Sequence, residues 1–409
     1  EAVFASMLAG NAVFFLDGYT KAIKVSSKGY PNLSVSESTR EKVLRGSKEG
    51  FTDAVKTNSA LVRKRIRDTR LKVKQKILGE RSQTVVQILY MEDLVRPGLV
   101  EEIEKRLDSF VIDGVLDSGI LEQMTESSWM SPFPQFQTTE RPDKCAAEIL
   151  NGRILVLTDH SPVGLLLPAV FNDFLQVSED YYNRFAIVSL QRLLRYGAVL
   201  MTMLFSGTYL AVTNFHTQVL PTNLILSFSE ARQGVPFPGI LEVLLMELAF
   251  EMIREAGVRM PGPLGGTIGI VGGLIIGQAA VTANLVSPIV VVVVAVSALS
   301  SLAIPTDEFS APFRLLKFGF VILGGTLGVF GMLLGLYLVL SHLAGQKSFG
   351  IPYLSPFAAQ NREGYCGERD SFIRFPLPFL NRRPIYARKE EQVKLRNPEN
   401  KKGEGHVYR

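Results

Sequence analysis

The stretch that decides the fold runs from Leu264 to Pro305 and reads LGGTIGIVGGLIIGQAAVTANLVSPIVVVVVAVSALSSLAIP. It contains no Asp, Glu, Lys or Arg, and it is long enough for two helical crossings of a bilayer, since about 20 apolar residues suffice for one. Two further stretches are free of these residues, Tyr196–Ser229 and Phe318–Gln346. The second half of the chain is therefore expected to be a helical membrane domain rather than the core of a soluble protein.

The rest of the composition is that of an ordinary polar protein. The chain has 409 residues, of which 47% are hydrophobic, and a formal net charge of +5. The basic excess lies largely beside the apolar stretches, so it does not indicate nucleic-acid binding, and we interpret the basic run Arg63–Arg67 as a solvated helix face. Cys145 and Cys366 have neither metal nor disulfide spacing, which fits a reducing compartment. The sequence begins within an expected helix, residues 1–9, so we expect a missing N-terminal segment.

The first 185 residues are expected to form an α/β region in the cytoplasm. Apolar periodicity, turn residues and helix-capping positions distinguish its elements. The expected helices are 49–67, 97–110, 116–125 and 144–150; the expected strands are 12–16, 21–25, 70–78, 84–91 and 153–158; and the Pro-rich residues 131–142 are expected to be a loop.

A short internal similarity suggests a duplication within this region. Residues 5–18 can be laid over residues 147–160, because both read helix, glycine, buried strand and Asp turn. Gly10 and Gly152 would end the two helices, where a positive φ favours glycine, and Asp17 and Asp159 would be turn residues rather than catalytic acids. We predict two related subdomains at residues 1–65 and 66–185. A transmembrane helical domain is predicted at residues 186–345 and a basic cytoplasmic tail at residues 346–409.

The positions of the basic residues predict the membrane topology. Arg184, Arg192 and Arg195 precede the first apolar stretch, and Arg382, Arg383, Arg388 and Lys389 follow the last. Basic residues flank membrane helices on the cytoplasmic side, so both termini are expected there and the number of crossings is even. Four spans satisfy this rule if residues 239–257 form a re-entrant or interfacial helix. The four expected spans are residues 197–215, 264–283, 285–304 and 316–343. A six-crossing arrangement that splits the region before Gly239 also remains open.

The span 264–283 has two different faces. Glycine recurs every four residues at Gly265, Gly269, Gly273 and Gly277, and such small-residue strips let helices approach closely in lipid. The opposite face carries weakly polar and apolar side chains, namely Thr267, Val271, Leu274, Gln278 and Thr282. These five residues could line a pore, or the helix could be an ordinary member of a bundle with Gln278 bonded to a neighbour. A second glycine strip in the last span, at Gly324, Gly328, Gly331 and Gly335, is interpreted as packing.

The helix 239–257 is apolar but carries several acids. Glu247, Glu251 and Glu255 lie within about a third of its circumference, together with Arg254. Acids inside a membrane are costly and usually face a cavity or a partner, so several copies in a ring could form a cation-attracting vestibule. Alternatively, this is the solvated face of an interfacial helix, with Glu251–Arg254 or Glu255–Arg259 as helical neighbours.

The sequence contains no constellation typical of an enzyme. It has no P-loop, no activated Ser or Cys signature and no metal-ligand cluster, so we expect neither catalysis nor a cofactor. His216, at the end of the first span, is interpreted as a hydrogen-bonded interface residue.

Several ordered motifs resemble those of the A subunits of GerA-type spore germination receptors. The central ones are Ser131-Pro132-Phe133-Pro134-Gln135 and Thr139-Glu140-Arg141-Pro142-Asp143. Further matches are Arg45-Gly46 with Glu49-Gly50-Phe51, Ser178–Tyr182, Pro236–Pro238 with Glu242, Arg254–Gly257, and residues 270–273 with 277–281. The resemblance extends from Gly10 to about Arg388, which is nearly the whole chain.

The resemblance implies a multi-pass protein in the inner membrane of bacterial endospores. It implies two partner subunits: a transporter-like B subunit that binds the germinant and a C subunit that is a lipoprotein. It also implies that the A subunit assembles as a homo-oligomeric ring and forms a cation channel that opens on germinant binding. Two other functions remain open, a non-conducting scaffold of the receptor and a secondary transporter, although the membrane half lacks the repeated broken spans typical of transporters.

Overall fold

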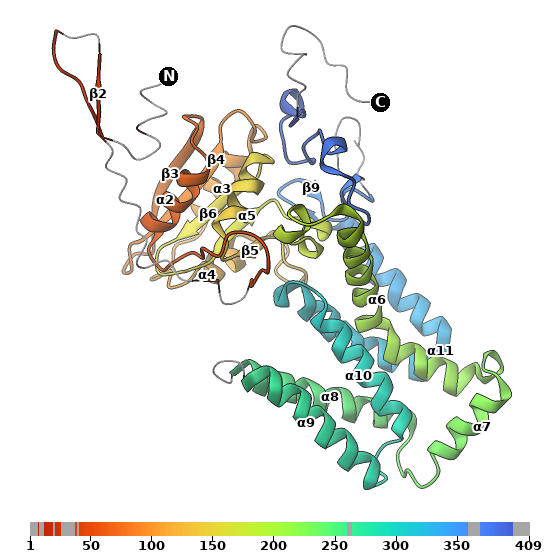
Figure 1. Ribbon diagram of the computed structural model, residues 1–409. Helices are drawn as coiled ribbons and strands as arrows, with labels where there is room; N and C mark the ends of the chain where they lie inside the picture. The colour runs from red at the N-terminus through yellow and green to blue at the C-terminus, as the bar shows by residue number, and fades with distance from the viewer. Residues whose placement is uncertain are drawn as a thin grey trace. The chain divides into compact units, whose positions relative to one another are not determined.

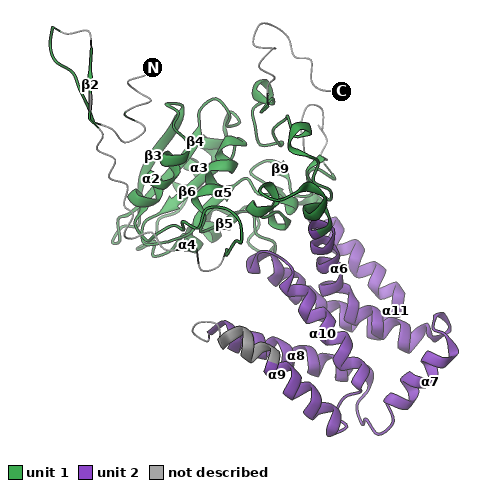
Figure 2. Cartoon of the chain, viewed as in Figure 1, with its two compact units in different colours: residues 1–190, 344–409 green, residues 191–343 purple. Residues whose placement is uncertain are grey.

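The computed structural model describes residues 7, 12–18, 21–25, 37–38, 41–259, 264–358 and 369–395, with only the backbone described at Lys24 and 264–270. The chain forms two compact units (Figure 2). Unit 1 comprises residues 1–190 and 344–409, and unit 2 comprises residues 191–343.

Unit 1 is built on a five-stranded antiparallel sheet with the order β3-β4-β6-β7-β5 (Figure 1). Its strands are β3 (Leu71–Leu78), β4 (Thr84–Met91), β5 (Gln137–Thr139), β6 (Ile154–Thr158) and β7 (Gly164–Leu167). Neighbouring residues point to opposite faces because the side-chain period of a strand is two. Leu89 and Leu155 therefore contribute to one apolar core, and Ile88 and Val156 to the other.

Helices cover both faces of the sheet. On one face, α2 (Val55–Arg65) and α5 (Pro142–Leu150) contribute buried residues such as Leu61 and Ile149. The core on the other face contains Ile103 of α3 (Leu99–Leu107) and Leu121 of α4 (Ser118–Thr125). Because α2 shares its core with β4 and β6, the boundary predicted at residue 65 does not separate two cores.

The expected strands 70–78, 84–91 and 153–158 correspond to β3, β4 and β6, and the expected helices have counterparts with shifted ends. The helix expected at 49–67 begins only at Val55, and Glu49 instead binds the side chains of Lys64 and Arg65. Two strands of the five-stranded sheet were not predicted: β5, within the expected loop, and β7.

The proposed duplication is only partly visible. The strands β1 (Ala12–Phe14) and β2 (Ile23–Val25) form a separate antiparallel pair, whereas β6 lies inside the five-stranded sheet. Gly152 follows α5 with φ +94°, as predicted, and a Cβ there would lie 2.7 Å from Ala387 Cα. Gly10 lies outside the described residues.

The described part of the predicted tail is not a separate domain. Residues 344–409 belong to unit 1, where β8 (Lys347–Ser348) pairs with β9 (Ile351–Pro352). Tyr353 and Tyr386 are buried, and Phe349 joins the core formed with α3 and α4. The tail therefore helps complete unit 1 with apolar side chains, which its basic composition did not indicate.

Unit 2 consists of helices. They are α6 (Phe185–Phe215), α7 (Thr222–Ala231), α8 (Gly239–Arg259), α9 (Leu264–Thr282), α10 (Pro288–Leu302) and α11 (Asp307–Gly345) (Figure 1). The predicted connector at 181–195 and the first span are joined in one helix, α6, and α7 was not predicted. By length and composition, two described helices could cross a membrane, α6 and α11.

The helix α11 is broken at Gly328, where the backbone takes the non-helical values φ 63° and ψ −144°. A Cβ at Gly335 would lie 2.9 Å from the Phe320 ring, and one at Gly331 would lie 2.4 Å from the Leu323 carbonyl oxygen. In a straight helix, residues 320 and 335 would be about 22 Å apart. The last expected span, 316–343, is therefore a hairpin of two segments, 307–327 and 329–345.

The contacts within unit 2 fix the relative directions of its helices. α8 runs antiparallel to the first segment of α11, because Glu247 contacts Lys317 and Arg254 contacts Asp307. Glu242 with Ser287 and Arg254 with Ser301 make α8 and α10 parallel. Gly273 with Phe250 and Gly272 with Ile253 make α8 and α9 antiparallel. Gly207 with Gly324 and Phe215 with Gly328 make α6 parallel to the first segment of α11. With these contacts, the chain alternates direction through α6, α8, α9, α10 and the two segments of α11.

Candidate functional site

The centre of unit 2 contains a buried ion pair between α8 and α11. Lys317 Nζ lies 2.6 Å from Glu247 Oε2, and both side chains are almost completely buried. The Ser206 hydroxyl of α6 donates a hydrogen bond of 2.6 Å to the other oxygen, Glu247 Oε1. Three helices thus meet at one carboxylate, which suits a buried charge because it needs both a counter-charge and hydrogen-bond donors.

Three further ion pairs extend this contact along α8 and α11. Arg314 donates a hydrogen bond to Glu251 Oε1, and Lys317 Nζ lies 3.9 Å from Glu251 Oε2. One turn further along α8, Arg254 lies 2.8 Å from Asp307. The helices are therefore joined by a row of opposite charges, which we call the α8–α11 charge ladder and define as Glu247, Glu251, Arg254, Asp307, Arg314 and Lys317.

Glu242 occupies a separate buried position at the beginning of α8. Its oxygens accept hydrogen bonds from Arg232, at 3.1 Å, and from the Ser287 backbone N–H before α10, at 2.9 Å. The carboxylate therefore joins the start of α8 to the start of α10.

The three acids proposed for a vestibule lie in different surroundings. Glu247 is fully buried and Glu251 is bound to Arg314, so neither is an unpaired acid on an open surface. Glu255 is exposed and pairs with Arg259 at 2.6 Å, as the alternative interpretation expected. The alternative pair Glu251–Arg254 is wrong, because each residue binds a partner on α11 instead.

The basic partners Arg314 and Lys317 were not predicted from the sequence, because they precede the charge-free stretch that begins at Phe318. A signal was nevertheless present: Arg314 and Lys317 are three residues apart and Glu247 and Glu251 are four apart, so each pair occupies one face of its helix.

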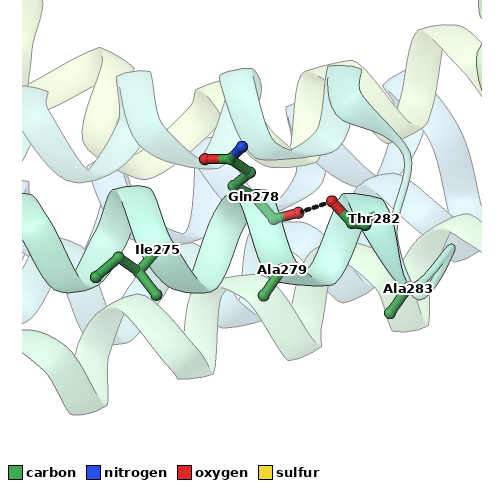
Figure 3. A pocket seen from close by; sticks show the side chains of 5 residues that line it. All are labelled: Ile275, Gln278, Ala279, Thr282 and Ala283. Carbon is green, nitrogen blue, oxygen red and sulfur yellow. Dashed lines mark hydrogen bonds between the residues drawn. The ribbon is translucent and has the colours of Figure 1, made fainter.

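The exposed side of α9 carries the described residues of the predicted pore-lining set. Val271, Leu274, Gln278 and Thr282 are exposed in the single chain, and the side chain of Thr267 lies outside the described residues. Gln278 and Thr282 line an open hollow together with Ile275, Ala279 and Ala283 (Figure 3). The Thr282 hydroxyl donates a 2.8 Å hydrogen bond to the Gln278 carbonyl oxygen, whereas no described hydrogen bond engages the Gln278 amide.

The glycines of α9 lie on its packed side. A Cβ at Gly273 would lie 3.1 Å from the Phe250 ring of α8, and one at Gly277 would lie 3.0 Å from Val291 of α10. The surroundings of Gly265 and Gly269 lie outside the described side chains. The described half of α9 thus has its glycines against the bundle and its polar groups on the open side.

In unit 1, the Ser-Pro-Phe-Pro-Gln motif holds the chain that follows α11. The Ser348 hydroxyl donates a 2.9 Å hydrogen bond to the Gln135 carbonyl oxygen, and Gln346 Nε2 donates one of 3.4 Å to that of Phe133. The Gln135 side chain accepts a hydrogen bond of 2.8 Å from Ser127. The motif therefore has a structural role that its sequence did not show.

The Thr-Glu-Arg-Pro-Asp motif meets two other motif segments in a second cluster. Arg141 lies 2.7 Å from Asp143, whose carboxylate also accepts a 3.0 Å hydrogen bond from the Tyr182 hydroxyl. Burial and the nearby Asp143 carboxylate raise the pKa of Tyr182 to about 12. Gly46, with φ +133°, lies against the Tyr182 ring, where a Cβ would come within 2.9 Å.

Glu41 completes this cluster. Its carboxylate lies 2.9 Å from Lys144 Nζ and accepts a hydrogen bond from the Thr139 hydroxyl. Burial alone would raise the pKa of Glu41, but the ammonium of Lys144 and these hydrogen bonds lower it overall. Residues from motifs nearly 100 positions apart therefore form one packed polar centre.

Comparison with known proteins places these observations in a family. The family "Bacillus/Clostridium GerA spore germination protein" matches residues 1–386. Spore germination protein GerLA of Bacillus cereus is 38% identical over 391 residues, which cover 96% of this chain and 79% of that protein. Spore germination protein A1 of Bacillus subtilis (strain 168) is 41% identical over 375 residues, which cover 91% of this chain and 77% of that protein.

Two further similar proteins are a membrane protein and a solved domain. The uncharacterized membrane protein YfkQ of Bacillus subtilis (strain 168) is 39% identical over 406 residues, covering 99% of this chain and 79% of that protein. The N-terminal domain of the A subunit of the Bacillus megaterium spore germinant receptor GerK3 is 32% identical, covering 42% of this chain and 60% of that one with a TM-score of 0.32.

The family match and the similar proteins define the class of this two-unit protein as a spore germination protein. The chain belongs to the GerA spore germination family.

Proposed function

We propose that this chain is the A subunit of a germinant receptor in the inner membrane of bacterial endospores. Membership of the GerA family and the similarity to several spore germination proteins support the receptor role. The partners would be a transporter-like B subunit and a lipoprotein C subunit. We further propose that several copies form a ring whose central cation path opens when germinant binds.

In this proposal, unit 2 crosses the bilayer six times rather than four. The six segments that alternate in direction are α6, α8, α9, α10, 307–327 and 329–345. The α8–α11 charge ladder supports counting α8 as a crossing, because Glu247 and Glu251 are neutralised within the bundle. An even number of crossings keeps both termini on the spore-core side, as the basic flanks require.

The observation that carries the channel proposal is the two-sided character of α9. Its glycines Gly273 and Gly277 pack against α8 and α10, while Gln278 and Thr282 line an open hollow. Polar groups are unfavourable on a lipid-facing surface. In an assembled ring, the five predicted residues, Thr267, Val271, Leu274, Gln278 and Thr282, would therefore line the path rather than face lipid.

The acidic residues take different roles in this ring. Glu255 is exposed and would be the acid available to attract cations, whereas Glu247 and Glu251 would hold α8 against α11. The vestibule set therefore reduces to Glu255 in this proposal.

The test substitutes the open side of α9 in the complete receptor. Gln278→Lys places a positive charge in the path, and Val271→Trp narrows it, so both variants should reduce the release of monovalent cations from spores exposed to germinant. Val292→Trp is the matched control, because Val292 is also an exposed Val on an apolar helix, α10. Release is measured with a cation-selective electrode, and receptor assembly by the level of each subunit in the inner membrane.

Different outcomes separate the channel from its alternatives. Normal cation release from an assembled Gln278→Lys and Val271→Trp receptor would exclude α9 as the pore wall and favour a non-conducting scaffold. Ion release coupled stoichiometrically to uptake of a solute would favour a secondary transporter.

A further inference from the structure

Unit 1 exposes an unusual concentration of large apolar side chains in one short segment. Residues 371–380 carry five of them, each between 42% and 52% exposed: Phe372, Ile373, Phe375, Leu377 and Phe379. The first turns of α6 expose three more, Phe185, Ile187 and Leu190. We call these eight residues the apolar collar. Concentrations of exposed apolar residues usually mark a surface that binds a partner or a membrane.

Hydrogen bonds fix the segment to the beginning of α6. The Arg374 backbone N–H donates to the Ser189 hydroxyl at 3.2 Å, and that hydroxyl lies 3.2 Å from the Arg374 carbonyl oxygen. The buried Arg374 guanidinium donates a 2.9 Å hydrogen bond to the carbonyl oxygen of Asn183. The two parts of the collar are therefore held together at the point where α6 begins.

The backbone of the segment is suited to surroundings with little water. The N–H groups of Phe375, Phe379 and Leu380 donate to carbonyl oxygens within residues 369–377, at distances between 2.9 and 3.1 Å. Pro376 and Pro378 have no N–H to satisfy. Backbone donors that lack a partner are expensive away from water, so these hydrogen bonds and the two prolines lower the cost of leaving water.

Helix geometry places the collar at a defined level on α6. This helix is continuous from Phe185 to Phe215, and its charge-free part begins at Tyr196. Ser189, where the segment is fixed, lies about 10 Å before Tyr196 at 1.5 Å per residue. The polar layer on each side of a bilayer is about 5–8 Å thick. If Tyr196 marks the edge of the hydrocarbon, the collar lies at the outer edge of the lipid headgroups.

The charges around the collar fit an anionic lipid surface. Arg184, Arg369 and Arg382 flank its two parts and are exposed. Basic side chains near an anionic membrane are attracted to its surface. Phe and Leu side chains are typical of the apolar face that interfacial segments bury at the boundary between headgroups and acyl chains.

We propose that the apolar collar inserts into the headgroup layer of an anionic bilayer and anchors unit 1 to the membrane at the start of α6. This inference rests on the proposed membrane crossing of α6. It adds a lipid-binding surface formed by residues 371–380 of the polar unit and by the first turns of α6, before the charge-free part of that helix.

The test measures the depth of single tryptophans in the full-length chain, reconstituted into vesicles of phosphatidylcholine and phosphatidylglycerol. Trp129, the one tryptophan in the sequence, is replaced by Phe, and Phe375→Trp or Leu377→Trp is introduced. Lipids brominated at carbons 6 and 7 or at carbons 11 and 12 quench tryptophans at different depths. Both variants should lose emission, more with the shallow bromines than with the deep ones, and less when phosphatidylglycerol is omitted.

Two control variants use similarly exposed positions. Ile77→Trp, on strand β3 of unit 1, should keep its emission with either lipid. Leu333→Trp, on the second segment of α11, should be quenched if unit 2 crosses the bilayer; these two residues are 62% and 61% exposed.

The outcomes distinguish the collar from the membrane proposal itself. If Leu333→Trp is quenched while Phe375→Trp and Leu377→Trp are not, the collar faces water, a protein partner or a second copy, and the inference is overturned. If Leu333→Trp is not quenched, the proposed crossing of unit 2 fails first. Equal quenching of Ile77→Trp would mean that unit 1 lies on lipid without a specific anchor, which also overturns the inference.

Discussion

Both units bury a basic residue, but they surround it differently. In unit 1, Arg153 of the sheet region is fully buried, and its guanidinium lies 3.2 Å from Glu148 and 3.6 Å from Asp173. It also donates a 2.8 Å hydrogen bond to the side-chain amide oxygen of Gln137. In addition, the Tyr386 ring lies 5.0 Å from its guanidinium. In unit 2, Lys317 has Glu247 at 2.6 Å and only a distant second acid, Glu251, at 3.9 Å.

This difference shows what each buried charge can tolerate. Arg153 has two carboxylates, so the loss of one leaves a counter-charge in place. Burial raises the pKa of Asp173 although Arg153 opposes it, which indicates how little water reaches that cluster. Lys317 and Glu247 depend mainly on each other, so the loss of either partner leaves a charge in apolar surroundings. The buried charge of Arg153 in unit 1 is therefore redundantly paired, whereas that of Lys317 in unit 2 relies mainly on one partner.

The largest effect is expected from breaking the pair in unit 2. Lys317→Met leaves Glu247 buried without its main partner, and removing one member of such a pair typically costs about 3–5 kcal/mol of stability. The double variant Lys317→Met, Glu247→Gln should recover much of this loss, because no unpaired charge remains. Unfolding in a series of detergent and dodecyl sulfate mixtures gives the free energies for the double-mutant cycle.

The matched change in unit 1 is Glu148→Gln, which leaves Asp173 beside Arg153 and should cost less than Lys317→Met. An equal or larger loss for Glu148→Gln would contradict the redundancy that we assign to unit 1. Additive effects in the unit 2 cycle would show that Lys317 and Glu247 are not coupled.

A smaller effect is expected at the closest helix contact of unit 2. A Cβ at Gly324 of α11 would lie 2.2 Å from the Gly207 carbonyl oxygen of α6, and backbone cannot move aside as a side chain can. Gly324→Ala should therefore force the helices apart and cost about 1–3 kcal/mol, as overpacking usually does. Thermal unfolding of the reconstituted protein measures the change.

Gly319 provides the control on the same helix, because a Cβ there would meet nothing within 4 Å. Gly319→Ala should leave stability unchanged or raise it slightly, since Ala is the better helix former. Equal losses at the two glycines would mean that the close contact with α6 does not decide the outcome.

Local patterns explain which parts of the fold the sequence predicted. Residues 84–91 were expected to be a strand and form β4, because an apolar run between turn signals defines such an element by itself. Strand β5 was missed because Gln137-Thr138-Thr139 has no apolar pattern, and its pairing with β7 joins residues some 25 positions apart. The break at Gly328 was also missed, because the same glycine spacing suits a straight packing helix.

The candidate site depends even more on contacts between distant residues. The two-sided pattern of α9 was readable because both faces belong to one helix. In contrast, Glu247 and Lys317 are 70 positions apart, and only the antiparallel packing of α8 and α11 brings them together. The acids of α8 could be identified from the sequence, but their pairing with basic residues of α11 could not be predicted from it.

A pH-dependent contribution is expected from Glu41 of unit 1. Its pKa in the folded protein lies below the ordinary value of 4.5, so the unfolded chain binds the proton more readily. Its stabilising effect is therefore complete above about pH 4.5 and is lost as the pH falls through the lower, folded value. At neutral pH, Glu41→Gln should cost about 1.5–3 kcal/mol, the usual contribution of hydrogen bonds to a charged group.

Cys145 allows this effect to be measured, because it is fully buried in the core beside α2. In a Cys366→Ser background, urea unfolding is followed by reaction of the Cys145 thiol with 4,4′-dithiodipyridine, which also reacts in acid. The difference between wild type and Glu41→Gln should shrink below pH 4.5. A difference that stays constant between pH 7 and pH 3 would show that packing, and not the charge of Glu41, is responsible.

The smallest effect is expected at Glu255, the exposed member of the predicted vestibule. Its pair with Arg259 joins two side chains that are 64% and 78% exposed, in an i,i+4 arrangement. Such pairs contribute about 0.3–0.5 kcal/mol, so Glu255→Gln should leave the unfolding midpoint of unit 2 almost unchanged. The same variant should slow germinant-triggered cation release if Glu255 attracts cations in an assembled ring. A marked loss of stability would instead place Glu255 in an interface, and unchanged release at unchanged stability would remove the last acid from the vestibule.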